Sequence, residues 1–183
     1  MTWRDIGAAL LALAALGCSS PEPTYDDRRA LDHTRAGAEA FQRGDVAAAA
    51  LHFERALELA RALGDLRAQS DALNNLGIVN EAIGRPDEAR ALYEAARAAA
   101  QPESQLADTF VGPHWPGVLA TNLNLARLAL ARGDLDSATS ALDAARDAAE
   151  RVATDEARID VLKQDALVEL AREGAGELSL IHI

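Results

Sequence analysis

The sequence predicts an all-α protein that forms one modest globular unit, and its composition carries that prediction. Alanine fills 42 of the 183 positions, and alanine has the highest helix propensity and little value in strands. Only 4% of the residues are aromatic, and the chain holds 12 glycines and 6 prolines. With 49% apolar residues, the chain is neither disordered nor fibrous, and a β-sandwich or β-barrel is excluded.

The charge balance argues against nucleic acid as a partner. The chain has 18 basic and 29 acidic residues, which gives a formal net charge of −11, and Lys163 is its only lysine. A phosphate backbone needs clustered cations and would be repelled by this field. The charges are also interspersed, as in the stretch 87–97, which is typical of solvated helical faces.

A repeated pattern predicts the individual helices. Segments 37–57, 77–97 and 126–146 align: a small residue is followed by glycine after seven positions, alanine after five more, a large apolar residue after four more and alanine after three more. The members, in order, are Gly37, Gly44, Ala49, Phe53 and Ala56; Gly77, Gly84, Ala89, Tyr93 and Ala96; and Ala126, Gly133, Ala138, Leu142 and Ala145. The small residues allow close approach of two helices, and the large residue fills the space between them.

The ends of these helices follow from local signals. The repeated glycines each end a first helix, Asp45 and Asp134 cap the next helix, and Pro86 suits a first helical position. Prolines between positions 101 and 117 predict a loop there. The expected helices are 27–43, 46–63, 67–83, 86–100, 117–132, 135–152 and 155–173. In the last one, Ile159, Leu162, Ala166 and Leu170 recur at helical spacing, and Gly174 stands where earlier first helices end.

From about residue 27 to 174, this pattern resembles the tetratricopeptide repeat, a helix–turn–helix unit. The resemblance implies an all-α, right-handed solenoid with repeats at about 27–63, 67–100 and 117–152, and a partial fourth at 155–174. Equivalent glycines are spaced by 40 and 49 residues, more than the common period of about 34. Extended helices or loops are therefore expected.

The N-terminus has the order of an export signal. An apolar run from Ile6 ends at Gly17, directly before Cys18, and it is too short to cross a hydrocarbon core of about 30 Å. The Ala-Leu-Gly-Cys junction resembles the lipobox of bacterial lipoproteins, which implies a signal peptide at 1–17, a lipidated Cys18 and a linker at 18–26. Ser19 resembles the residue found in lipoproteins of the outer membrane. The alternative is an inert buried thiol.

Residues 178–183, LSLIHI, break every pattern before them. They resemble the translation of a transposase adapter used in sequencing libraries, so we expect the chain to be a gene fragment. The alternative is a native apolar tail that docks on the end of the solenoid.

No spacing of residues predicts catalysis, a metal site or a cofactor. The four histidines lie far apart in sequence, without a paired arrangement. The carboxylates Asp87 and Glu88 suit the first turn of a helix, where negative charge is favoured. Trp115 is expected to cover the gap between two repeats, with a ligand platform as the alternative.

The first helices of stacked repeats line a concave groove, and in related repeats an asparagine of this groove bonds an extended ligand. The resemblance places Asn75 and Asn124 in that role, and adjacent groove residues would be Phe41, Ile78, Leu123 and Arg127. An amide both donates and accepts, which suits a peptide backbone of any sequence. The alternative is that these asparagines hold a neighbouring helix.

The sequence thus predicts a non-enzymatic adaptor, lipid-anchored in the cell envelope, that binds a protein segment and serves envelope assembly or scaffolding. The outer membrane, facing the periplasm, is the expected location. One alternative is a docking module of a larger envelope enzyme whose catalytic domain lay beyond Glu177. Another is a self-assembling structural repeat.

Overall fold

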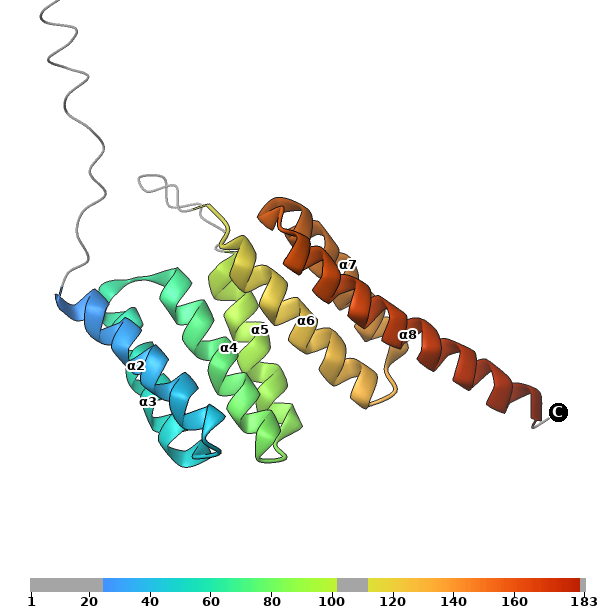
Figure 1. Ribbon diagram of the computed structural model, residues 1–183, viewed down its shortest axis with the longest axis horizontal. Helices are drawn as coiled ribbons and strands as arrows, with labels where there is room; N and C mark the ends of the chain where they lie inside the picture. Colours follow the sequence, from blue (N-terminus) through green and yellow to red (C-terminus); the bar gives the residue numbers. More distant parts are fainter. Residues whose placement is uncertain (1–24, 102–111, 182–183) are drawn as a thin grey trace, which may run out of the picture.

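The computed structural model describes residues 25–101 and 112–181, and the side chains of residues 28–101 and 112–174. This part of the chain is entirely helical (Figure 1). The helices, in order, are α2 (Tyr25–Gln42), α3 (Val46–Leu63), α4 (Leu66–Ala82), α5 (Pro86–Ala100), α6 (Trp115–Ala131), α7 (Leu135–Val152) and α8 (Asp155–Ile181). The predicted all-α class is confirmed.

Consecutive helices pack as antiparallel hairpins, and the hairpins stack side by side. Helix α2 packs on α3, α4 on α5, and α6 on α7, while α8 lies on α7 and α6 at the end of the stack (Figure 1). We call α2, α4, α6 and α8 the A helices and α3, α5 and α7 the B helices. This arrangement confirms the predicted solenoid of helical hairpins.

The turns form as their residues predict. Gly44, Gly84 and Gly133 have φ angles of 81°, 76° and 73°, a left-handed conformation that glycine adopts without a Cβ clash. The Asp45 side chain accepts a hydrogen bond from the Ala48 amide at 3.0 Å, and the side chain of Asp134 accepts one from the Ser137 amide at 3.0 Å. These contacts confirm the predicted N-caps.

The core is made where a small residue of an A helix meets a large residue of its B helix. A Cβ atom added to Gly37 would lie 2.7 Å from a ring carbon of Phe53, and one added to Gly77 would lie within 3 Å of the Tyr93 ring. In the third hairpin, Ala126 and Leu142 are buried in one cluster. The predicted close approach of each helix pair is therefore confirmed.

Several boundaries differ from expectation, most of them by one or two residues, and two of the differences, at the start of α6 and at the end of α8, have a structural reason. Helix α6 begins at Trp115, before the expected start at 117, because Pro116 occupies its first turn, where a missing N–H costs nothing. Helix α8 runs on to Ile181, so the expectation that Gly174 ends it is wrong. Unlike the turn glycines, Gly174 has no left-handed φ and takes part in the helix. Most of the expected loop, residues 102–111, lies outside the described residues.

Candidate functional site

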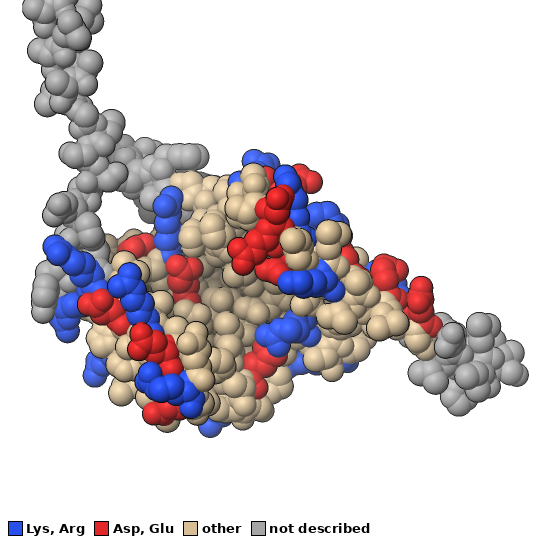
Figure 2. All heavy atoms as spheres, viewed as in Figure 1, with Lys and Arg blue, Asp and Glu red and all other residues tan. Residues whose placement is uncertain are grey.

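The stack has a concave face, and the A helices line it. Neighbouring A helices contact one another along the stack: α2 contacts α4, α4 contacts α6, and α6 contacts α8. Within the described residues, no such contact joins one B helix to the next. A stack whose A helices lie closer together than its B helices curves toward the A side. Figure 2 shows the face seen in Figure 1, with uncharged side chains in its hollowed middle and charged ones around them.

A chain of polar contacts crosses this face from α4 to α6. Asn124 Nδ2 donates to Asn74 Oδ1 at 2.9 Å, and the Arg127 guanidinium donates to Asn124 Oδ1 at 3.3 Å. Arg127 also donates two hydrogen bonds to the Glu81 carboxylate, one of them over 2.8 Å to Oε2. We call these four residues the polar ladder. The polar ladder fixes the distance between α4 and α6.

The ladder is anchored in the core through Tyr93 of α5. Its hydroxyl donates to Glu81 Oε2 at 3.0 Å, and its side chain is fully buried. Burial and then the charge of Glu81 raise the pKa of Tyr93 well above its usual range, so the phenol stays a donor. Partial burial opposes the charge of Arg127, but the hydrogen bond and the charge of Glu81 raise its pKa overall. The guanidinium therefore stays a cation.

Asn75 lies beside the ladder but is not part of it. Its side chain is half-buried on α4, and it makes no hydrogen bond within the described residues. Because an amide can donate and accept at once, this side chain can bond a ligand without first breaking an internal contact. Asn75 and Asn124 hold the same place in the repeated pattern, but only Asn124 has hydrogen-bond partners within the described residues.

Asn124 makes the helix-to-helix contact that the sequence left open as the alternative. Its Oδ1 accepts from Arg127 and its Nδ2 donates to Asn74. One N–H of its amide group remains outside these bonds, so a ligand contact by Asn124 stays a prediction.

The apolar groove candidates are half-buried, with one side against the core. Phe41 packs on the cluster shared by the first two hairpins, and Ile78 on the cluster around Tyr93. Leu123 touches both clusters of the third hairpin. Together with Asn75, Asn124 and Arg127, all six predicted groove residues are half-buried and lie on A helices. Ligand binding by these six residues stays a prediction.

The sequence reading missed the partners of these residues. Glu81 and Asn74 carry half of the polar ladder, yet neither belongs to the repeated pattern. Tyr93 was recognised as the large packing residue, but its role as a donor was not. One signal was available: Glu81 stands four residues after Gly77, where Phe41 follows Gly37, and a charge at such a position implies a partner on a neighbouring helix.

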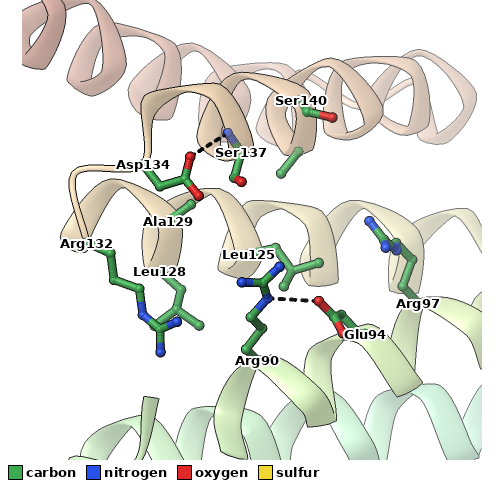
Figure 3. A pocket seen from close by; sticks show the side chains of 11 residues that line it. Arg90, Glu94, Arg97, Leu125, Leu128, Ala129, Arg132, Asp134, Ser137 and Ser140 are labelled. Carbon is green, nitrogen blue, oxygen red and sulfur yellow. Dashed lines mark hydrogen bonds and ion pairs between the residues drawn. The ribbon is translucent and has the colours of Figure 1, made fainter. Parts of the chain in front are cut away.

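A second hollow lies between α5, α6 and α7 (Figure 3). Leu125, Leu128 and Ala129 of α6 form its floor. Two of the arginines that line it are held in ion pairs: Arg90 with Glu94 at 2.9 Å and Arg132 with Asp87 at 2.6 Å. A third, Arg97, also lines the hollow. No residue of this hollow was predicted as a binding site.

The histidines and Trp115 have structural contacts. Although His33 and His52 are distant in sequence, their Nδ1 atoms lie 3.1 Å apart across α2 and α3. No group of three or more potential metal ligands occurs in the described part of the chain. Trp115 packs against the cluster between α5 and α8, and the Arg151 guanidinium carbon lies 5.2 Å from its ring centre. This position agrees with the expected cover between repeats.

The predicted lipid anchor, Cys18, lies outside the described residues, as does the whole export signal. Among the helices that are described, none combines the length and the apolar character needed to cross a membrane.

Comparison with known proteins supports the repeat assignment. Residues 27–101 match the family model described as tetratricopeptide repeat. The match covers α2 to α5, and α6 with α7 repeats the same arrangement. No curated protein matches the chain. Residues 27–101 are therefore similar to tetratricopeptide repeats, and the described helices form a solenoid of stacked hairpins that is consistent with this similarity. Solenoids of this kind present extended concave surfaces that bind other proteins.

Proposed function

We propose that this protein is an adaptor that binds an extended segment of a partner protein on its concave face. One observation carries the proposal: Asn75 presents a half-buried amide, without an internal partner among the described residues, next to a polar ladder that is already satisfied. Because the side chain is only half-buried, water can bond its donor and acceptor in the free protein. A ligand backbone can replace that water without breaking an internal contact.

The surroundings of Asn75 suit a peptide. Ile78 lies one helical turn further along α4, and Leu123 lies on α6 next to Asn124. Their exposed sides offer apolar contact to the side chains of an extended segment, while the amide recognises its backbone. Because the ladder fixes the spacing of α4 and α6, the groove is formed before the ligand arrives, which lowers the entropic cost of binding.

The proposal includes a location. The lipobox-like junction at Cys18 supports a lipid anchor in the bacterial cell envelope, at the outer membrane and facing the periplasm, where the adaptor serves assembly or scaffolding. Two or more acyl chains anchor a protein stably, so the solenoid would be tethered to the membrane surface rather than inserted.

Single asparagine substitutions test the binding role. Tagged wild-type chain and its variants are used to capture partners from an envelope extract, and their melting temperatures are measured in parallel. Asn75→Ala should melt like the wild type and capture less of the partner. One lost hydrogen bond of about 1 kcal/mol weakens binding roughly fivefold. Asn124→Ala should lower the melting temperature, because it breaks the ladder.

The matched control is Asn80→Ala on the same helix. Its amide donates to the Leu76 carbonyl at 2.9 Å, so it is engaged within α4 and should affect capture little. If Asn75→Ala captures the same proteins in the same amounts as the wild type, the binding surface lies elsewhere and the proposal fails.

A further inference from the structure

Two histidines that stand 19 positions apart in the sequence meet between α2 and α3. His33 of α2 and His52 of α3 are both half-buried, and their Nδ1 atoms lie 3.1 Å apart. The ring planes are tilted by 39° and the ring centres are 5.4 Å apart, so the rings meet through their nitrogens and are not stacked. We call these two residues the histidine pair. Neither belongs to the repeated pattern, so no spacing in the sequence indicates that they meet.

The two Nδ1 atoms can be held together in more than one way. A hydrogen bond between them needs one nitrogen to carry a proton and the other to offer its lone pair. In the other tautomer of the donor ring the proton sits on Nε2, and both Nδ1 lone pairs then point into the same space. Two lone pairs that converge in this way repel each other unless a cation lies between them. The histidine pair therefore has a second state that a bound cation stabilises.

We propose that the histidine pair binds one divalent ion of a late transition metal, such as Zn²⁺, through the two Nδ1 atoms. Bonds from such ions to histidine are about 2.0–2.1 Å long, which places two ligands about 3.3 Å apart around a tetrahedral ion and about 2.9 Å apart around a square-planar one. The observed separation of 3.1 Å lies between these values. Each ring needs only a rotation about χ2, a torsion with a broad energy minimum, to aim its lone pair at the ion.

The surroundings leave room for the remaining ligands of the ion. His33 lines a hollow of about 500 Å³ between α2 and α3, so water can complete the coordination sphere. The described residues contain no group of three or more potential metal ligands, so the site is open and binds less tightly than a closed structural zinc site. Arg55 also lines the hollow, but Glu58 pairs with its guanidinium at 2.6 Å. The net charge of −11 favours the approach of a dication.

A metal ion at the histidine pair would join α2 to α3. Helix α2 stands at one end of the stack and packs mainly on α3 (Figure 1). In an unfolded chain, two residues this far apart in sequence rarely meet, so the ion binds the folded hairpin in preference and stabilises it. The proposed site thus makes the stability of the first hairpin depend on metal.

Isothermal titration calorimetry of the full chain with ZnCl₂ tests the proposal. Every sample carries Cys18→Ala, which removes the only thiol, and we call this chain the parent. His33→Asn should raise the Zn²⁺ dissociation constant about tenfold or more, because asparagine keeps a hydrogen-bonding group near the place of Nδ1 but is a poor zinc ligand. The parent should bind Cu²⁺ more tightly than Zn²⁺ and should not bind Mg²⁺ at this site.

The matched control is His114→Asn. His114 is also half-buried, but its Nε2 lies 3.2 Å from Asp71 Oδ1 and away from the histidine pair. The control should bind Zn²⁺ as the parent does. A parent that binds no Zn²⁺ overturns the proposal. Binding that both His33→Asn and His52→Asn leave unchanged also overturns it, because other residues would then hold the ion.

Electron paramagnetic resonance of bound Cu²⁺ keeps the test decisive if a variant fails to fold. With less than one equivalent of Cu²⁺, the spectrum of the parent should show coupling to two imidazole nitrogens, since each ring of the histidine pair supplies one. A folded His33→Asn chain should show coupling to one nitrogen at most. Coupling to fewer than two nitrogens in the parent overturns the proposal without reference to any variant.

Discussion

Gly77 sets the distance between two helices at the scale of a single residue. A Cβ atom at this position would lie within 3 Å of the Tyr93 ring, which is fully buried and cannot move aside. Gly77→Ala should therefore cost about 1–3 kcal/mol of unfolding free energy through overpacking, although alanine favours helices. Chemical denaturation followed by circular dichroism measures the change.

Gly174→Ala is the matched control. Gly174 is also helical, but nothing lies within 4 Å of an added Cβ atom. Only the higher helix propensity of alanine then matters, so the unfolding free energy of the variant should rise by about 0.5–1 kcal/mol. Equal effects of the two substitutions, in either direction, would show that the assigned packing register is wrong.

Tyr93 should make stability depend on pH in the alkaline range. Its pKa is raised in the folded state by burial and by Glu81, while an exposed tyrosine titrates at about 10. Above that pH the unfolded chain ionises its tyrosine and the folded chain does not, so the unfolding free energy falls as pH rises. Below about pH 10 this contribution is fully present.

In Tyr93→Phe the unfolding free energy should fall less steeply as pH rises. The same substitution removes the hydrogen bond to Glu81 and should lower stability at neutral pH. Urea denaturation at several pH values between 9 and 11 measures the slope, where the range is chosen around the ordinary tyrosine pKa of about 10. The same slope in wild type and Tyr93→Phe would contradict the account.

Most helices could be predicted from the sequence because their boundaries depend on local chemistry. Glycine at Gly84 and proline at Pro86 act within a few residues of themselves, so a repeated pattern is enough to place them. Gly174 shows the limit of this reasoning. It has the right spacing for a helix end, but a glycine ends a helix only when the chain turns there, which depends on more distant packing.

The candidate site could be predicted only in part, for the same reason. The face of each A helix follows from its periodicity, so Asn75, Asn124 and Arg127 were placed on A helices correctly. The contacts of Asn124 with Asn74 and of Arg127 with Glu81 join residues 50 and 46 positions apart. Such pairs depend on how the hairpins stack, so a charge such as Glu81 indicates that a partner exists but does not identify it.

The N-cap of α4 provides a test at the scale of an element. The Asp65 side chain accepts hydrogen bonds from the amides of Arg67 and Ala68 at 3.0 and 3.1 Å. Asp65→Ala leaves these donors without a partner and should cost about 1 kcal/mol, whereas Asp65→Asn should cost much less. Thermal melting of both variants measures this. If the two melt alike, the cap contributes nothing.

At the scale of the whole molecule, the proposed lipid anchor at Cys18 would decide where the solenoid acts. Expressed in a bacterium, the wild-type chain should incorporate labelled palmitate and partition into detergent, because acyl chains add about 0.8 kcal/mol per buried methylene. Cys18→Ala should do neither. Equal labelling of the variant and the wild type would remove the basis for a lipid anchor.

The curvature of the stack separates a concave from a convex surface, and we propose that partners bind the concave one. Ile78 lies on α4 beside Asn75, whereas Ala91 is exposed on the B helix α5. A photo-reactive amino acid placed at either position reports which proteins come within its reach, without the partner having to be known beforehand.

Photo-cross-linking from these two positions in intact envelopes tests whether partner proteins bind the concave face. The probe at Ile78 should form a discrete cross-linked product with a partner protein, and Asn75→Ala in the same chain should reduce it. The probe at Ala91 should give little of that product. If Ala91 yields the same product as strongly, or if Asn75→Ala leaves the Ile78 product unchanged, the concave face is not the binding surface.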